Sequence, residues 1–153
     1  MTSFPLPDPM RRALALAEAA GAAGDVPVGA VVTSANGAIL GEGRNRMRAD
    51  HDPSAHAEVV ALRAAGQALG SSRLDGCTLW VTLEPCAMCA GAIANARIAT
   101  LHVAASDPKG GGVLHGPRLF DQPTCHHRPE VDVGLGEDQA AAMLRDFFRT
   151  RRR

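Results

Sequence analysis

The chain contains 153 residues, enough for one compact domain, and 46% of them are hydrophobic, which permits a core without disulfides. Lys plus Arg and Asp plus Glu are both 16, so the formal net charge is zero, which argues against a uniformly basic, non-specific nucleic-acid binder. No run approaches the roughly eighteen apolar residues that span a bilayer, and the first nine residues lack the basic start of a signal peptide. We therefore expect a cytoplasmic protein that does not associate with membranes.

The pattern of apolar residues, glycines and prolines predicts alternating helices and strands. Asp8-Pro9, Ser54 or Asp52, and Pro85 indicate helix starts, with Asp8 as the N-cap of the first helix, and Asn36-Gly37 indicates a β-hairpin. In chain order we expect a helix over 10–23, strands over 28–33 and 38–43, a loop over 43–52, a helix over 55–69, a strand over 77–82, a helix over 85–95, a strand over 98–104, an irregular segment over 106–129 and a helix over 137–149. This order indicates a layered α/β domain with helices packed on a sheet.

Two short clusters contain residue types that bind metals. His56-Ala57-Glu58 lies near the start of the predicted helix 55–69, and Pro85-Cys86-Ala87-Met88-Cys89 opens the predicted helix 85–95. Cys86 and Cys89 are three residues apart and share a helix face, and a helix N-terminus favours the thiolate form that binds zinc. His56 would supply a third ligand. Three protein ligands leave one tetrahedral position for water, which is typical of a catalytic zinc site.

Glu58 is two residues from His56, about 200° around a helix, so we expect it to move protons across the site rather than bind the metal. Each cluster taken separately has a simpler interpretation. A Cys-x-x-Cys pair is often redox-active or merely buried, four cysteines can form two disulfides in a secreted protein, and His-x-Glu is usually a capped helix start. Cys77 is expected to be a core residue. Cys125-His126-His127 is the one rival metal feature, for which we expect loop hydrogen bonding.

These residues resemble the motifs of bacterial tRNA-specific adenosine deaminases of the TadA type, in the cytidine deaminase-like superfamily. The resemblance extends from about Met10 to Arg152, and its ending bears most on the substrate, because generic cytidine or guanine deaminases are not expected to carry it. After Lys109 the chain departs from the Ala/Gly-Ser-rich run of many relatives and resembles a variant branch. The matching segments are Asp25-Val-Pro-Val-Gly-Ala-Val31, Asn45-Arg46, His51-Asp-Pro-Ser-Ala-His-Ala-Glu58, Val81-Thr-Leu-Glu-Pro-Cys-Ala-Met-Cys-Ala-Gly91, Asp107-Pro-Lys109, Asp146-Phe-Phe-Arg149 and Arg151-Arg152.

The resemblance implies a three-layer α/β/α cytidine deaminase-like fold, with a central mixed five-stranded sheet flanked by helices, in a single deaminase domain over residues 1–153. Residues 1–7 are expected to be flexible and residues 150–153 to form a basic tail. The implied reaction is hydrolytic conversion of adenosine to inosine at the wobble position of a tRNA anticodon stem-loop, most often in an arginine tRNA, by a homodimer.

The resemblance also assigns roles to individual residues. Each subunit is expected to bind one Zn²⁺ through His56, Cys86 and Cys89, with Glu58 as the catalytic proton shuttle. Asn45 is expected to hydrogen-bond the flipped-out adenine. The remaining substrate contacts are expected from Val28 and Ala57 at the base, from Asp107 and Lys109 near the ribose or flanking nucleotides, and from Phe147, Phe148 and Arg149.

Two alternatives remain open at this point. A deaminase of a free base or nucleoside (guanine, cytosine or cytidine) is favoured by the altered loop and the neutral total charge, and an inactive zinc module that only binds RNA is disfavoured by the intact Glu58. For Phe147 and Phe148, core packing is an equal alternative. The neutral total conceals an asymmetry, because the last nine residues contain five Arg and one Asp, and three more Arg lie within 44–48.

Overall fold

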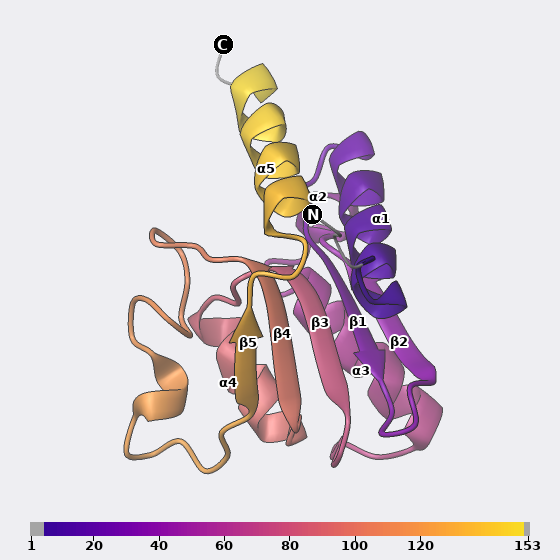
Figure 1. Ribbon diagram of the computed structural model, residues 1–153, viewed down its shortest axis with the longest axis vertical. Coiled ribbons are helices and arrows are strands. Elements are labelled where there is room, and N and C mark those ends of the chain that lie inside the picture. Colours follow the sequence, from indigo (N-terminus) through magenta and orange to yellow (C-terminus); the bar gives the residue numbers. More distant parts are fainter. Residues whose placement is uncertain (1–4, 152–153) are drawn as a thin grey trace.

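The computed structural model describes residues 5–151, which form a five-stranded sheet with helices on both faces (Figure 1). The strand order is β2-β1-β3-β4-β5; β1 pairs antiparallel with β2 and β3, whereas β3, β4 and β5 are parallel, so the sheet is mixed. The elements are α1 (Asp8–Ala22), β1 (Gly29–Thr33), β2 (Ile39–Arg44), α2 (Met47–Asp50), α3 (Ala57–Leu69), β3 (Thr78–Leu83), α4 (Ala87–Ala96), β4 (Thr100–Ala105), the 3₁₀ helix η1 (Leu119–Asp121), β5 (Glu130–Val133) and α5 (Glu137–Arg151).

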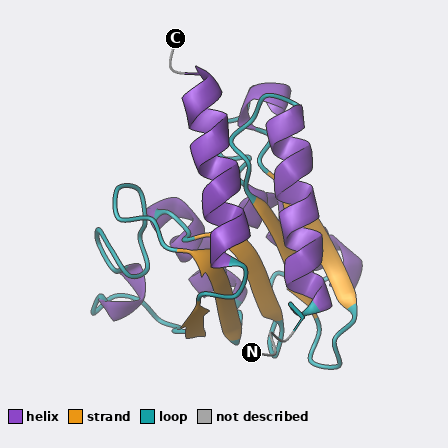
Figure 2. Ribbon diagram, turned by 45° about the horizontal axis from the view of Figure 1, so that its top comes forward, coloured by secondary structure: helices purple, strands orange, loops and turns teal. Residues whose placement is uncertain are grey.

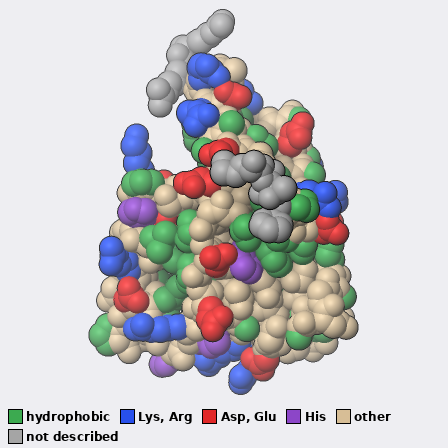
Figure 3. Space-filling model, in the orientation of Figure 1, with side chains coloured by type: hydrophobic (Ala, Val, Ile, Leu, Met, Phe, Trp, Pro, Cys, Tyr) green, Lys and Arg blue, Asp and Glu red, His purple; other side chains and the backbone are tan. Residues whose placement is uncertain are grey.

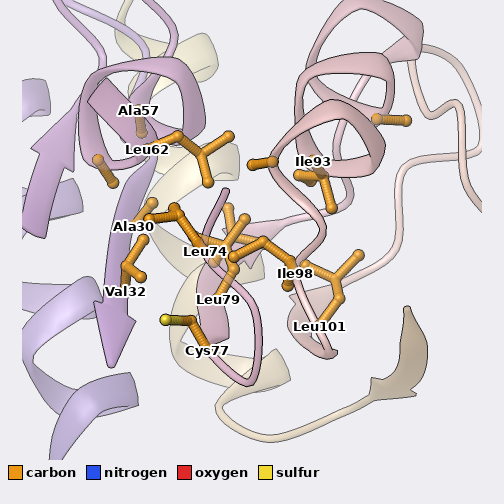
Figure 4. Close-up of a cluster of buried hydrophobic side chains, with 14 of the residues drawn as sticks. Ala30, Val32, Ala57, Leu62, Leu74, Cys77, Leu79, Ile93, Ile98 and Leu101 are labelled. Carbon is orange, nitrogen blue, oxygen red and sulfur yellow. The ribbon is translucent and has the colours of Figure 1, made fainter. Parts of the chain in front are cut away.

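Different helices cover the two faces of the sheet (Figure 2). Successive strand residues point to opposite faces. In β1, Val31 therefore packs in the cluster that contains Met10 of α1 and Ala140 of α5, whereas Ala30 and Val32 belong to the larger cluster formed with α3 and α4. Figure 4 shows part of this larger cluster, which includes residues of β3 and β4. The predicted three-layer α/β/α fold with a mixed five-stranded sheet is confirmed.

The ends of the described chain fall near those of the first and last helices. Residues 1–4, part of the segment predicted to be flexible, lie outside the described residues, as do Arg152 and Arg153 of the predicted basic tail. The N-cap of α1 is Pro7, whereas Asp8, the predicted cap, lies in the first turn of the helix. No helix within residues 5–151 is long and apolar enough to cross a membrane.

The caps of α3 and α4 differ from those predicted by the local sequence. His56 and Cys86 occupy the two N-cap positions, in extended backbone conformation, and neither helix has a side-chain cap hydrogen bond. The residues predicted to cap α3, Asp52 and Ser54, bond to each other instead, because the Ser54 backbone N–H and hydroxyl both donate to Asp52 Oδ1. His56 and Cys86 therefore each lie one position before a helix, at its positive end.

The stretch 43–52, predicted to be a loop, contains regular structure. Strand β2 continues through Arg44, and four residues form the short helix α2. The buried carboxylate of Asp25 accepts the backbone N–H groups of Arg48 and Ala49 at 2.9 and 3.3 Å, which satisfies donors at this helix. Because the partner lies more than twenty residues away, local sequence patterns do not indicate it.

Strand β2 approaches α3 so closely that only glycine fits at two positions. A Cβ atom on Gly43 would lie 2.3 Å from the carbonyl oxygen of Ala57 and 2.6 Å from the backbone nitrogen of Ala61, and a Cβ on Gly41 would lie 2.5 Å from Ala61 O. These are helix backbone atoms, which cannot rotate away. The contact therefore sets how deeply the start of α3, with His56 and the residues that follow it, sits against the sheet.

We expect Gly43→Ala to lower the free energy of unfolding by about 3 kcal/mol, because an extra methyl group overpacks a close backbone contact. Gly91→Ala in α4 is the matched control, since its added Cβ would meet Leu119 Cδ2 at an ordinary 3.7 Å. Alanine within a helix should raise the free energy of unfolding by about 0.5–1 kcal/mol there. Urea denaturation of both variants measures the difference, and equal stability of Gly43→Ala and the wild type would contradict the close packing.

Candidate active site

Three metal-binding side chains meet between the N-termini of α3 and α4. His56 and Cys86 are the N-cap residues of these helices, and Cys89 lies in the first turn of α4. Their ligand atoms all lie within 4.8 Å of one another, and among the described residues no other group of this kind was found. Thirty residues of chain separate His56 from Cys86, and packing of both helices on one face of the sheet brings them together.

The spacing of the three ligand atoms fits a tetrahedral zinc ion. His56 Nδ1 lies 3.5 Å from Cys86 Sγ and 3.4 Å from Cys89 Sγ. Zinc bonds of about 2.3 Å to sulfur and 2.0–2.1 Å to nitrogen, at tetrahedral angles, separate these atoms by about 3.6 Å. One nitrogen and two sulfur ligands leave a fourth position for water. A donor set with one open position is typical of catalytic rather than structural zinc sites.

The surroundings favour a thiolate at Cys86. Hydrogen bonds from the Cys89 thiol and from His56 lower the pKa of Cys86 to about 4. The same bond to Cys86, together with burial, raises the pKa of Cys89, and the hydrogen bond to Cys86 raises the pKa of His56. Because metal ions bind deprotonated thiols, a site where one thiolate is already favoured is suited to a divalent cation.

Glu58 lies in the first turn of α3 and lines the same cavity as His56 and Cys86. Its side chain is buried, and this burial raises the pKa of Glu58 to about 7, against the opposing effects of a hydrogen bond from its own backbone N–H and of the neighbouring His56. A carboxyl group with a pKa near neutrality can both accept and release a proton at physiological pH. Glu58 is therefore a candidate for proton transfer beside these three side chains.

A cavity of about 200 Å³ adjoins the metal-binding residues. Its walls come from the chain before β1, the loop around α2, the start of α3, the end of β3 and the segment after β4. The lining residues are Val26, Val28, Asn45, Met47, His56, Ala57, Glu58, Leu83, Glu84, Cys86, Asp107 and Gly110. Four residues predicted to contact the substrate, Val28, Asn45, Ala57 and Asp107, thus line one cavity together with Glu58.

Asn45 is buried, and its side-chain orientation is set by α2. Its backbone N–H donates to the carbonyl of Val28 at 3.1 Å, and its side-chain oxygen accepts the N–H of Met47 at 3.2 Å. With the oxygen engaged, the amide NH₂ group is the part of this side chain that is available to a ligand in the cavity. Asn45 therefore presents a hydrogen-bond donor there.

Two other predicted contacts lie beside the cavity rather than in its lining. Lys109 is exposed, and its backbone N–H donates to Asp107 Oδ1 at 3.2 Å. Phe147, with the Arg151 guanidinium 4.2 Å above its ring, lines a second cavity of about 240 Å³. This second cavity shares three lining residues with the first, so the two adjoin: Val26, Asn45 and Met47.

The last two predicted contacts lie away from the ligands. Phe148 and Arg149 line a hollow of about 550 Å³ along α5, together with Leu144 and Arg145. Phe148 is 45% exposed, and neither Phe147 nor Phe148 is a buried core residue. Phe148 and Arg149 therefore lie on the surface of α5, outside the cavity that contains Glu58.

The other cysteines do not gather metal ligands. The Cys125 thiol donates to the carbonyl of His127, and His127 Nε2 lies 2.6 Å from the carbonyl oxygen of Ile98, so loop hydrogen bonding occupies this motif. Cys77 is buried in the larger core cluster, where Figure 4 labels it. All four cysteines are free, which excludes disulfides between them in this structure.

Sequence reasoning missed five lining residues: Val26, Met47, Leu83, Glu84 and Gly110. The apolar ones carry no signal, because their residue types are equally typical of core positions. Glu84 carries one. A carboxylate directly after an apolar strand and directly before Pro85 is out of place in a core, and it indicates a buried polar contact.

The protein-family model that describes the MafB19-like deaminases matches residues 7–152 of this chain. The fold and the site are thus those of a deaminase of nucleobase type, with a His, Cys, Cys donor set and a neighbouring Glu. A tRNA-specific adenosine deaminase from Agrobacterium fabrum is 50% identical over 143 residues, covering 94% of this chain and 93% of that protein. The chain belongs to the family of tRNA-specific adenosine deaminases.

Solved structures show the same relationship. A structure from studies of A-to-I editing by tRNA:A34 deaminases at the wobble position of transfer RNA is 49% identical, covers 89% of this chain and 98% of its own, and has a TM-score of 0.87. The guanine deaminase of Bacillus subtilis is 35% identical, covers 94% of this chain and 91% of its own, and has a TM-score of 0.63. The first of these two is the more similar by both measures.

Proposed function

We propose that this protein is a zinc-dependent deaminase that converts adenosine to inosine at the wobble position of a tRNA anticodon, with an arginine tRNA as its main substrate. The observation that carries this proposal is the placement of the buried Glu58 beside the His56, Cys86 and Cys89 group, in one cavity with the donor amide of Asn45. The 50% identity to a tRNA-specific adenosine deaminase supports the substrate.

His56, Cys86 and Cys89 would hold one zinc ion per subunit. A zinc ion at these ligands supplies Lewis-acid activation of water near neutral pH. Glu58 accepts one proton from the attacking water and delivers it to the purine ring nitrogen beside C6. It then takes the second proton from the new C6 hydroxyl and transfers it to the departing amine, which leaves as ammonia. Water and adenosine are thereby converted to inosine and ammonia.

The other cavity residues would bind and orient the base. Asn45 donates its amide N–H to an acceptor atom of adenine, while Val28 and Ala57 supply apolar contact. Asp107 faces the ribose or a flanking nucleotide, and Lys109 extends from the exposed rim toward phosphate. Entry of the base requires unstacking, at a cost of a few kcal/mol that is least for an unpaired nucleotide, so an anticodon loop is favoured over a duplex.

Helix α5 supplies the positive surface and an aromatic group for the remaining nucleotides. Figure 3 shows Lys and Arg side chains on its projecting part, where Arg145, Arg149 and Arg151 are exposed. Phe147 lines the cavity that adjoins the Glu58 cavity, where an unstacked base can lie against an aromatic ring. The neutral total charge therefore does not oppose RNA binding, since exposed arginines gather on α5 and Arg151 lines the cavity that adjoins the Glu58 cavity.

We also propose that the chain forms one deaminase domain that acts as a homodimer in the cytoplasm, where its tRNA substrate occurs. A groove of about 640 Å³ between α3 and α4 offers an apolar surface to a second copy, with Val59, Leu62 and Ala92 in its lining. The test is the solution mass of the purified protein by light scattering. A monomer at micromolar concentration would contradict the dimer.

Deamination of a free base or nucleoside is the second candidate function. The 35% identity to a guanine deaminase favours it, because that relative shares the scaffold. One experiment separates the two functions. Purified protein is incubated with an arginine tRNA transcript carrying a wobble adenosine and, in parallel, with guanine, cytosine, cytidine and adenosine, and inosine and ammonia are measured. Ammonia from a free base with no inosine in the tRNA would overturn the leading proposal, and inactivity on all substrates would favour an inactive RNA-binding module.

We expect Arg149→Gln to weaken binding of an anticodon hairpin and to reduce the slope of log K against log salt by about one phosphate contact, or about 0.7–0.9. Arg73→Gln is the matched control. Both arginines are exposed and pair with a nearby aspartate, but Arg73 precedes β3, at the end of the strand opposite the site. Fluorescence anisotropy titrations at several salt concentrations measure the slopes, and equal slopes for the two variants would contradict a phosphate contact at Arg149.

A further inference from the structure

Glu84 is a buried carboxylate at the end of β3 that the mechanism above does not use. Its side chain has no exposed surface. Its two oxygens accept backbone N–H groups at 2.9–3.2 Å, from Asp107, Val113, Leu114 and His115. The His115 side chain adds a fifth bond, with Nδ1 at 2.8 Å from Oε1. Because an ionised carboxylate can only accept, this nitrogen carries the hydrogen.

Through these bonds Glu84 holds both ends of the segment 107–115. Oε1 accepts the N–H of Asp107 at one end, and Oε2 accepts three consecutive N–H groups at the other, an arrangement that forms a nest around the negative charge. Within the segment, Asp107 Oδ1 accepts the N–H of Gly110 at 3.0 Å. Asp107 and Gly110 line the cavity that contains Glu58, so the position of this wall depends on Glu84.

The same contact explains Gly111, and a close approach to the start of α4 explains Gly112. A Cβ atom on Gly111 would lie 2.1 Å from Glu84 Oε2, and a Cβ on Gly112 would lie 2.6 Å from the backbone nitrogen of Ala87, at the start of α4. The segment is therefore packed directly between the carboxylate and the helix start that carries the metal-binding cysteines. Larger residues at these two positions would push the wall away from both.

We propose that Glu84 and His115 are positioning residues for the deamination: the buried carboxylate, with the His115 Nδ1–H as its fifth donor, holds residues 107–115 as a wall of the substrate cavity. This inference rests on the proposed function. Five donors already occupy the roughly four lone-pair sites of the carboxylate, so Glu84 is not free to bind substrate or to transfer a proton. It acts through the wall that it holds.

Substitutions of His115 test the proposal, because two amide side chains imitate its two ring nitrogens separately. Asn places a donor where Nδ1 lies, whereas Gln places one nearer Nε2. We expect His115→Ala and His115→Gln to raise KM for an anticodon hairpin about tenfold with kcat within about twofold, since the wall binds ground state and transition state alike. His115→Asn should restore KM to within about twofold of the wild type.

The control is His126→Ala, an exposed histidine of the same irregular segment whose ring makes no hydrogen bond to another described residue. It should leave KM unchanged. Restoration of KM by Gln and not by Asn would show that the exposed Nε2 contacts RNA, and would overturn the proposal. So would an unchanged KM in His115→Ala.

Hydrogen exchange gives a readout that does not need activity. The amides of residues 113–115 should exchange at least about tenfold faster in His115→Ala and in Glu84→Gln than in the wild type. In Glu84→Gln the reason is that the new side-chain NH₂ group faces backbone donors and cannot accept their hydrogens. In His115→Asn these amides should exchange at the wild-type rate. Zinc content should stay at about one per chain in the His115 variants. If the wild type does not edit the hairpin, the proposed function fails, whereas the exchange rates still support or contradict the contact by the same criterion.

Discussion

Replacement of Glu58 by alanine should lower kcat for inosine formation by about 10³-fold or more, while about one zinc ion per chain is retained. The expected loss is large because general acid–base groups contribute about 10²–10⁴-fold and this residue serves two proton transfers. The buried carboxyl group faces the His56, Cys86 and Cys89 group without being needed for the tetrahedral donor set. Glu58→Gln, which keeps the shape but cannot carry the proton, should lose the same activity.

Glu18→Gln is the control, because Glu18 is exposed on α1 and lies outside the cavity. Activity is measured as inosine formed in an anticodon hairpin, and metal as zinc per chain by inductively coupled plasma mass spectrometry. Loss of zinc from Glu58→Gln would show that this carboxylate is a ligand. Retention of substantial turnover by Glu58→Ala would contradict the proton-transfer role.

Replacement of Cys89 should remove the metal. We expect Cys89→Ala to fall from about one zinc per chain to near zero, to lose detectable deamination, and to melt at a lower temperature, because metal binding free energy contributes to the stability of the folded state. Cys89 is fully buried and its sulfur lies 3.4 Å from His56 Nδ1. Treatment of the wild type with a strong chelator should reproduce both losses.

Cys77→Ala is the matched control for this experiment. Cys77 is likewise a buried cysteine, but it packs in the core cluster beside β3 rather than with the ligands. Its replacement should retain the metal and lower the free energy of unfolding by about 1 kcal/mol, the typical cost of a small truncation in a core. Retention of about one zinc per chain in Cys89→Ala, equal to that of Cys77→Ala, would contradict the assignment of Cys89 as a ligand.

Elements with strong local signals could be predicted from the sequence, and those held by distant partners could not. A hairpin joins β1 and β2 at Asn36-Gly37 as expected, with Gly37 at a positive φ of 89°. The loop is longer than the two-residue turn that this pair indicates, because the strands pair only from Thr33 and Ile39 and Asn36 has no positive φ. The short helix α2 depends on the distant carboxylate of Asp25, and β5 consists of exposed residues that pair with β4. The short helix α2 has no apolar period, and the apolar/polar alternation of β5 spans only four residues, Glu130–Val133, which is too short for a firm prediction.

The candidate site divides in the same way. The metal-binding residues and Glu58 follow from ligand chemistry and from spacing near helix starts, and the resemblance adds Asn45 and Asp107. The bonds that position these two residues were not predictable, since the Asn45 side chain is oriented by the backbone of α2 and the backbone N–H of Asp107 is held by the side chain of Glu84. Their partners are chosen by how loops pack, which local periodicity does not encode.

The amino-acid sequence by itself determines the neutral charge and indicates both the zinc-type donor set and the alternation of helices and strands. Each of these depends on residue type or on spacing within one element. Folding then settles which distant segments meet. It places His56 and Cys86 at facing helix starts, closes the cavity with a loop fixed to Glu84, and leaves Phe148 and Arg149 on the surface of α5. The reason is physical: the grouping of ligand atoms and the burial of Glu58 and Glu84 arise between elements, from packing on the sheet.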